Sequence, residues 1–260
     1  MRSRRGLILV TTGALLVLAV WNAVWLTRYA IAQQHTIGVD YRFYVYVAER
    51  WLDTGAFYAP HQLAGPYVAE TARDNLYPPL ALYLFLPFAR LPAILWWLVP
   101  TALLVVAIVR LRPPDWTWPI LALIAWVPGT QVAYIFGNTA IWVVAAIAWG
   151  CLLGWPAPLA LVKTSAAPFA LIGVWRRSWW IGLIVVMLAA IPLGSLWIDY
   201  LAVVRNGAVD LGYNINSYPL LLLPVVASLG RVPWLTRLRS RTDAPSTYGT
   251  TGGVTSPDAS

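Results

Sequence analysis

Long apolar stretches separated by short polar segments make up most of the chain. A helix needs about twenty apolar residues to cross the hydrocarbon of a bilayer, and fewer when it is tilted or anchored at its ends. The pattern therefore predicts an all-α, polytopic integral membrane protein with about eight spanning helices. The predicted spans are residues 6 to 32, 78 to 92, 93 to 110, 116 to 135, 139 to 154, 155 to 175, 179 to 204 and 217 to 231.

Composition supports a membrane protein. Of the 260 residues, 60% are hydrophobic and only 11% are charged, which is more apolar surface than one soluble core of this size buries. The net charge of +8 comes from arginines that cluster at the ends of the predicted spans, a pattern typical of membrane topology and headgroup contact. Membrane lipids are therefore expected partners, and nucleic acid is not.

Orientation follows from the same arginines, because cationic residues are retained on the cytoplasmic side. The N-terminus is expected in the cytoplasm and the loop from 33 to 77 on the outer face, with Arg110 and Arg112 as exceptions that fall outside. We expect residues 1–235 to form the transmembrane domain. The stretch 236–260 is rich in Ser, Thr, Gly and Pro without apolar periodicity, so we expect a disordered cytoplasmic tail.

The outer loop carries the first candidate for chemistry. Apolar residues recur at helical spacing after Asp40, and Gly55 supplies a stop, so we expect a helix that lies in the membrane interface. Asp40 at its start is interpreted in two ways that can coexist. Its carboxylate can cap the helix N-terminus, or it can act as a base at the membrane surface.

Sugar transfer from a polyprenyl phosphate is a reaction for which one carboxylate suffices. The phosphate leaves as a stable anion without a general acid, while one base removes the proton of the acceptor hydroxyl. Cations are needed near the departing phosphate. Lys163, the only lysine, lies about 12 Å inside its predicted span.

An ionised amine at that depth needs a partner or a cavity. Asp199 in the next span is a possible ion-pair partner, and such a pair organises helices without any chemistry. Arg42 and Arg73 of the outer loop are alternative phosphate ligands, although interfacial arginines often contact headgroups nonspecifically. Tyr44 follows Asp40 among aromatic residues. Tyr77, Pro78 and Pro79 are expected to fix the start of the second span, and Gly137-Asn138 to form a tight turn.

Taken in order, these residues resemble the polytopic GT-C glycosyltransferases, most closely glycosyltransferase family 87 with its polyprenol-phosphate-mannose-dependent mannosyltransferases and related arabinofuranosyltransferases. The resemblance covers roughly residues 7 to 205 and rests on Asp40, Ala48, Gly55, Tyr58, Tyr77-Pro78-Pro79-Leu80, Gly137-Asn138, Lys163, Pro168 and Trp175-Arg176-Arg177.

The resemblance implies an inverting transferase of a bacterial plasma membrane. It would move mannose or arabinofuranose from a polyprenyl-phosphate donor to a glycolipid or cell-envelope glycan on the outer face. Asp40 matches the family's base, Tyr77 to Leu80 its proline pair, and Lys163 its lysine within the membrane. The family's glycine-glutamine turn appears as Gly137-Asn138, which the eight-span order places at the inner face.

Two other functions remain open. Family members are usually longer, so the chain is alternatively a shortened, non-catalytic relative that binds or helps translocate a lipid-linked sugar. Lys163 and Asp199 within spans also suggest a small-solute transporter, which ranks lowest because no internal repeat is visible. No cofactor is expected to be required, and a divalent metal held by Asp40 with Asp74 or Glu70 is optional.

Overall fold

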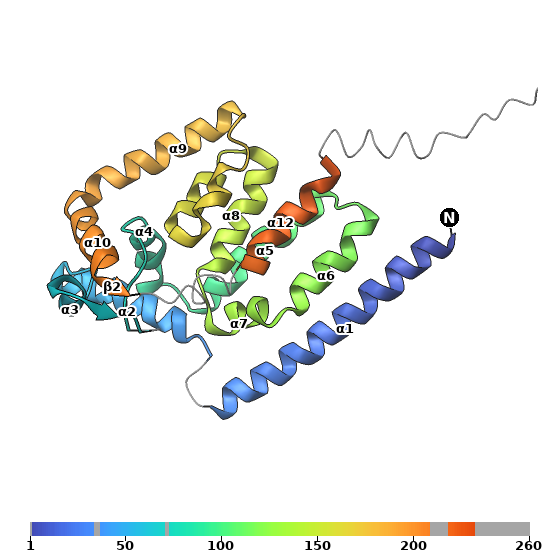
Figure 1. Ribbon diagram of the computed structural model, residues 1–260, viewed down its shortest axis with the longest axis horizontal. Coiled ribbons are helices and arrows are strands. Elements are labelled where there is room, and N and C mark those ends of the chain that lie inside the picture. The colour runs from blue at the N-terminus through green and yellow to red at the C-terminus, as the bar shows by residue number, and fades with distance from the viewer. Residues whose placement is uncertain (1, 34–36, 71–72, 209–217, 232–260) are drawn as a thin grey trace, which may run out of the picture.

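The computed structural model describes residues 2–33, 37–70, 73–208 and 218–231, so the predicted tail 236–260 lies outside the described part. The described chain is almost entirely helical, as predicted. Its only sheet pairs β1 (Tyr67–Val68) with β2 (Gly207–Ala208) in parallel. Near the middle of the molecule, α8 packs against α5, α12 and η3 (Figure 1).

The longer elements alternate with short 3-10 helices. In chain order they are α1 (Arg2–Ala32), α2 (Val39–Thr54), α3 (Pro60–Ala64), α4 (Ala81–Phe85), η1 (Leu86–Ala89), α5 (Ile94–Leu111), η2 (Asp115–Thr117), α6 (Trp118–Trp126), α7 (Pro128–Phe136), α8 (Ala140–Leu153), η3 (Ala157–Val162), η4 (Thr164–Leu171), α9 (Arg177–Ala190), η5 (Ile191–Leu193), α10 (Gly194–Asn206), α12 (Tyr218–Ser228) and η6 (Leu229–Arg231).

Within the described residues, three helical stretches are long and apolar enough to cross a membrane: Arg4–Ala32, Ile94–Leu111 and Arg177–Asn206. The pair α6 and α7, bent by 56°, makes a fourth if it counts as one span. Pro128 begins α7 at this bend, where its ring and missing N–H interrupt a continuous helix. The helices α8 and α12 are apolar but shorter.

Besides 116 to 135, two further predicted spans are not continuous helices. Residues 78 to 92 form only α4 and η1, and residues 155 to 175 form η3 and η4, which pack against each other. Prolines explain both differences. Pro87 lies inside the first stretch, while Pro158 and Pro168 lie in the second, where each removes a backbone donor and favours short 3-10 turns. The predicted total of eight spans is therefore not the arrangement found.

Arginines from distant segments gather at one end of the molecule, here called the arginine end and defined by Arg5, Arg110, Arg112 and Arg176. Arg5 lies 3.7 Å from Asp115, shortly after Arg112 in the chain. Arg176 donates to the Leu152 carbonyl, and Leu152 shares a hollow with Arg110 and Arg112. The predicted order separated Arg110 and Arg112 from the N-terminal arginines, and the structure contradicts that separation.

The opposite end contains α2 and the rest of the predicted outer loop. The buried side chain of Gln62 donates to the Tyr67 hydroxyl and to the Asn75 carbonyl, while Asn206 at the end of α10 donates to the Gln62 carbonyl. The parallel pair of β1 and β2 adds to this contact. These bonds attach the loop to the end of α10, beside α2 and α3 (Figure 1).

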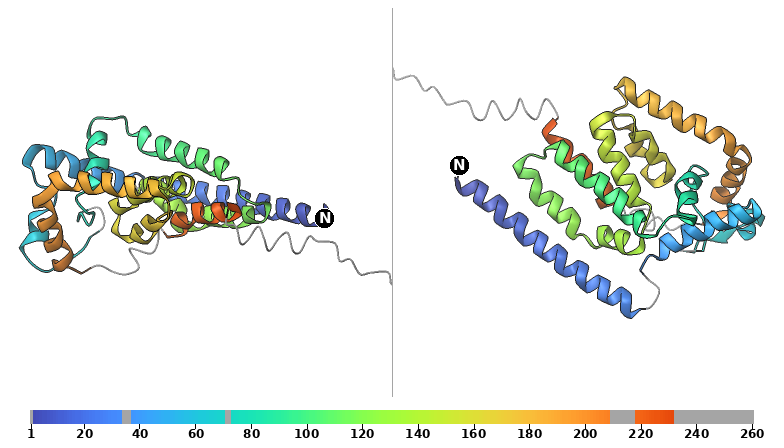
Figure 2. Two further views of the ribbon diagram at one scale, coloured as in Figure 1. Left: turned by 90° about the horizontal axis from the view of Figure 1, so that it is seen from above. Right: turned by 180° about the vertical axis from the view of Figure 1, so that it is seen from behind.

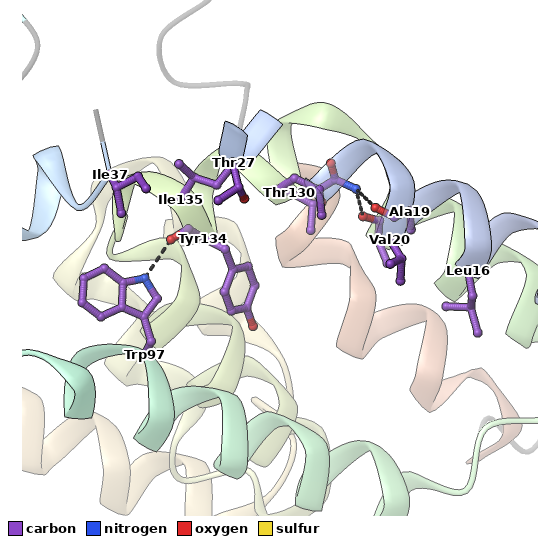
Figure 3. A pocket seen from close by; sticks show the side chains of 12 residues that line it. Leu16, Ala19, Val20, Thr27, Ile37, Trp97, Thr130, Tyr134 and Ile135 are labelled. Carbon is purple, nitrogen blue, oxygen red and sulfur yellow. Dashed lines mark hydrogen bonds between the residues drawn. The ribbon is translucent and has the colours of Figure 1, made fainter. Parts of the chain in front are cut away.

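The edge of the bundle opposite the arch of α9 and α10 is formed by α1, which lies along α6 and α7 (Figure 2). Gln131 of α7 fixes this contact by donating to the Ala19 carbonyl at 2.9 Å and accepting from Asn22 at 2.9 Å. A mostly apolar hollow of about 540 Å³ lies between α1, α5 and α7, beside the bond from Trp97 to the Tyr134 carbonyl (Figure 3).

Candidate functional site

The turn between α7 and α8 brings Asn138 into position. Gly137 ends α7 with φ 71°, and its N–H and that of Asn138 bond to the carbonyls of Tyr134 and Ala133, which is a Schellman motif. Trp96 donates to the Gly137 carbonyl at 2.8 Å. Backbone bonds to α7 and the Trp96 side chain of α5 thus both stabilise the turn. The side chain of Asn138 faces α2.

Asn138 joins the two charged residues that the sequence singled out. Its Nδ2 donates to Oδ2 of Asp40 at 2.7 Å, and its Oδ1 accepts from Nζ of Lys163 at 2.9 Å. The same Oδ1 accepts from the N–H of Ala140 at 3.0 Å, at the start of α8. We call this arrangement the Asn138 bridge. It connects α2, the α7–α8 turn and the junction of η3 with η4.

The chemistry of the two charged partners fixes the orientation of the Asn138 amide. A carboxylate only accepts hydrogen bonds, so it requires the NH₂ group, and an ammonium only donates, so it requires the oxygen. Rotating the amide by 180° would place two acceptors against each other at Asp40 and two donors at Lys163. The bridge therefore has one arrangement when both groups are charged.

Asp40 is the second residue of α2 and is buried, with 7% of its surface exposed. Burial raises the pKa of its carboxyl group above the ordinary value of 3.8, and the Asn138 hydrogen bond and the Lys163 charge oppose that rise. Gly38, whose φ is 67°, is the N-cap residue that precedes the helix, and no side chain caps it. The interpretation of Asp40 as the N-cap is therefore wrong, because its carboxylate bonds to Asn138 instead.

Lys163 lies where η3 ends and η4 begins, in an extended conformation with φ −131° and ψ 110°. It is partly buried, and its Nζ lies 5.9 Å from the centre of the Tyr77 ring. The Ala160 carbonyl accepts from its N–H, and its own carbonyl accepts from Ala166, so both 3-10 helices are anchored at this residue. The ammonium group is thus placed by backbone geometry beside the Asn138 bridge.

Hydroxyl groups form a second network next to the bridge. The hydroxyls of Tyr44 and Tyr77 lie 2.8 Å apart, and Thr139 donates to the Tyr77 hydroxyl at 2.9 Å. The Tyr77 carbonyl accepts from the hydroxyl of Tyr58 at 2.9 Å. Because Tyr77 also faces the Lys163 ammonium, the two networks meet at its ring.

The predicted proline pair directly follows Tyr77 in the chain. Pro78 and Pro79 are buried, and their carbonyls accept from the N–H groups of Ala81 and Leu82 as α4 begins. They start a helix as predicted, but a short one. Their position carries Tyr77 from the outer loop to the Asn138 bridge.

Three other predicted residues are not brought to the bridge. Lys163 bonds to Asn138 and forms no ion pair with Asp199 within the described chain. Asp199 instead lies near Tyr58, where its charge adds to the burial that raises the pKa of that phenol. Exposed Arg73 pairs with Glu70 at 2.9 Å. Exposed Arg42, two residues after Asp40, donates to the Ile37 carbonyl at 2.7 Å.

An apolar cavity of about 600 Å³ reaches this region between α5, α8, η3 and α9. Leu80 and Val162 are among its lining residues, and they directly follow Pro79 and precede Lys163. Asp40 and Lys163 are not themselves in its lining. The cavity therefore borders the two elements that carry Tyr77 and Lys163, and its walls suit a hydrocarbon chain.

A divalent metal was left as optional by the sequence. Among residues 2–33, 37–70, 73–208 and 218–231, no three His, Cys, Asp or Glu side chains gather at metal-binding distance. Asp74 lies 2.6 Å from His61 and accepts from the N–H of Glu70, while Asp40 bonds to Asn138.

The sequence indicated Asn138 only as part of a turn, and Thr139 not at all. The available signal was a pair of polar residues directly after Gly137, between two apolar helices. Such residues are placed by the turn and must find polar partners. Trp96 gave no signal, because a buried indole whose N–H bonds to a distant carbonyl looks like any other apolar position in a helix.

Comparison with protein-family models, with curated proteins and with solved structures found no match.

Proposed function

We propose that the protein is an inverting glycosyltransferase that moves a sugar from a polyprenyl-phosphate donor to a hydroxyl of a glycolipid or cell-envelope glycan. Asp40 is the base in this proposal. The observation that supports it is the Asn138 bridge, which holds one carboxylate and one ammonium group at a fixed separation. A base for the acceptor and a cation for the departing phosphate are the two charges this reaction needs.

In the proposed step, Asp40 takes the proton of the acceptor hydroxyl as the acceptor oxygen attacks the anomeric carbon. The bond from that carbon to the phosphate oxygen breaks, and its electron pair leaves with the polyprenyl phosphate. The raised pKa of Asp40 makes its carboxylate a stronger base than an exposed one. Attack from the face opposite the phosphate inverts the anomeric centre.

Lys163 and the tyrosine hydroxyls serve the phosphate side of the proposed reaction. The ammonium of Lys163 and the hydroxyls of Tyr44 and Tyr77 are hydrogen-bond donors that suit phosphate oxygens. The apolar cavity beside Leu80 and Val162 suits the first isoprene units of the donor. Arg42, on the same helix as Asp40, is retained as a further phosphate ligand.

The membrane arrangement we propose places the Asp40 end outside and the arginine end in the cytoplasm, because positively charged residues are retained inside. In this arrangement α1, α5, α6 with α7, α8, α9 with α10, and α12 cross the membrane. The pair η3 and η4 enters from the cytoplasmic side and returns, with Lys163 at its tip. This GT-C-like bundle has fewer crossings than the sequence predicted, and it belongs in a bacterial plasma membrane.

The burial of Asp40 also supports the second candidate, a non-catalytic protein that binds a lipid-linked sugar. A carboxylate with only 7% of its surface exposed is reached by an acceptor only if the surrounding elements move. In a binding protein the Asn138 bridge would simply orient Lys163 toward the donor phosphate. Turnover therefore separates the two candidates.

The deciding experiment uses membranes that contain the full chain, supplied with acceptor lipids and radiolabelled polyprenyl-phosphate mannose or arabinofuranose. Asp40→Asn removes the base but keeps the size of the side chain, and we expect transfer to fall at least about 100-fold. Asp53→Asn, an exposed acid on the same helix, is the matched control and should leave transfer unchanged.

The same preparation also measures retention of the labelled donor. Transfer by the wild type that is lost in Asp40→Asn supports the enzyme with Asp40 as base. Undiminished transfer by Asp40→Asn overturns that role. Saturable donor binding by the wild type without any transfer to any acceptor identifies the protein as the non-catalytic relative.

A further inference from the structure

A charged hollow lies at the arginine end of the molecule. It is formed where α5 and α8 end, whereas Asp40 lies near the start of α8. The hollow has a volume of about 380 Å³ and is lined by Arg110, Arg112, Trp149, Leu152 and Leu153. The last turn of α5 and the last two turns of α8 therefore supply it. It joins two cationic side chains to an apolar wall, which is the composition of a site for an amphiphilic anion.

One of the two charged side chains of this hollow, that of Arg110, packs on an aromatic ring. The guanidinium carbon of Arg110 lies 5.3 Å from the centre of the Trp149 ring, and Trp149 itself is fixed by a bond to the Leu103 carbonyl. Next to the hollow, Arg176 donates to the Leu152 carbonyl at 2.7 Å. A third arginine thus adds to the positive potential at this point.

The backbone of Arg112 is an independent sign of function. It ends α5 with φ 52° and ψ 66°, and it is the only residue other than glycine with a positive φ in the part of the chain that the structure describes. Glycine is the residue that helix ends normally use for this conformation. An arginine accepts strain there, and what the chain gains over glycine is a cation beside the hollow.

The hollow is next to apolar space. Trp149 and Leu153 line both the basic hollow and the 600 Å³ cavity between α5, α8, η3 and α9. An anion bound by Arg110 and Arg112 therefore lies beside apolar walls that suit hydrocarbon. A free phosphate would occupy only the first part, whereas a lipid would occupy both.

We propose that this site binds an anionic glycerophospholipid, with its phosphate against Arg110 and Arg112 and the start of one acyl chain against Trp149 and Leu153, at the end of the apolar cavity away from Leu80 and Val162. Both arginines stand at the end of the apolar helix α5, which is where lipid headgroups lie. The ligand is a lipid of the leaflet at the arginine end. It is distinct from the sugar donor, whose phosphate is expected at the Asp40 end.

Binding is measured by thermal unfolding of the full chain in a neutral detergent with added lipid, since a ligand that binds only the folded state raises the melting temperature. The three additions are phosphatidylglycerol, phosphatidylcholine with the same acyl chains, and inorganic phosphate. We expect a saturable rise with phosphatidylglycerol. The other two should produce little change, because one lacks net negative charge and the other lacks a chain.

Variants then locate the site. Arg112→Gly relieves the strained backbone, so the protein should fold at least as well without lipid, yet bind phosphatidylglycerol about fivefold more weakly. Removing both charges with Arg110→Gln and Arg112→Gln should weaken binding about thirtyfold. Arg90→Gln, an exposed arginine before α5, is the control and should bind as the wild type does.

Three results would overturn the proposal: equal stabilisation by phosphatidylcholine, equal stabilisation by inorganic phosphate alone, or wild-type affinity in the double variant. None of these measurements uses glycosyl transfer. These measurements therefore test the lipid site independently of the function proposed for Asp40.

Discussion

Asn138 donates a hydrogen bond of 2.7 Å to Asp40, a residue 98 positions earlier in the chain. The bond connects the start of α2 with the turn between α7 and α8. It also settles which end of the molecule the Gly137-Asn138 turn occupies, because a residue bonded to Asp40 lies on the same side as Asp40. The eight-span order placed that turn on the other face, and that placement is wrong.

Replacing Asn138 by aspartate tests the bridge directly. Asn138→Asp keeps the shape but puts a carboxylate oxygen where an NH₂ group faced Asp40, and two carboxylates at this distance resist ionising together. We expect transfer at neutral pH to fall roughly 10- to 100-fold and the acid limb of the rate profile to move to higher pH. Initial rates across pH measure both, and a wild-type profile would contradict the bridge.

The pH dependence of the wild type follows from the burial of Asp40. Its pKa is raised above 3.8, so the base is protonated and inactive at low pH, and transfer should increase as pH rises through that raised pKa. Lys163→Met removes a charge that holds this pKa down, so the acid limb should shift further upward. Arg73→Gln, on the exposed loop, is the control that should leave the limb in place.

The sequence allowed the helical class and the two charged residues to be predicted because both depend on local information. Apolar length identifies helices, and a carboxylate or amine among apolar residues is conspicuous wherever it lies. The contact between Asp40 and Asn138 depends on how α2 docks on the α7–α8 turn, which no local pattern encodes. The eight-span count failed at 155 to 175 because length alone does not distinguish one long helix from two short 3-10 helices packed together.

The positions of Arg110 and Arg112 also depended on the predicted number of spans. Arg110 and Arg112 contradicted the predicted orientation only because one predicted span, residues 78 to 92, is not a continuous helix. Without that crossing, the last turn of α5 falls beside Arg5 and Asp115. Arg110, Arg112 and Arg176 lie at one end with Arg5, and the error lay in counting helices from hydropathy.

Gly137→Ala should be strongly destabilising. A Cβ at this position would lie 2.7 Å from the Trp97 ring and 2.9 Å from Cβ of Tyr41, and the backbone φ of 71° is itself unfavourable for alanine. Gly55→Ala has nearly the same φ, 73°, but nothing within 4 Å of its Cβ. It should cost about 1 kcal/mol, while Gly137→Ala should cost roughly 2–4 kcal/mol.

Thermal unfolding in detergent compares the two glycine variants, and their difference isolates the clash from the backbone strain. Equal melting temperatures would mean that Trp97 and Tyr41 move away without penalty. Gly137 forms the turn that places Asn138. The Gly137→Ala variant should therefore also lose more transfer activity than its loss of folded protein explains.

Gln131 of α7 is the residue we expect to control the attachment of α1. Its side chain bonds to the Ala125 carbonyl of α6 and, in α1, to the Ala19 carbonyl and Asn22. Most of the surface of α1 is otherwise exposed. Gln131→Leu keeps the approximate size but leaves Asn22 without this partner, at a cost of about 1–3 kcal/mol. The double variant Gln131→Leu with Asn22→Leu removes both polar groups and should recover most of that loss, which thermal unfolding will measure. Equal stability of the single variant and the wild type would show that apolar contact alone holds α1 in place.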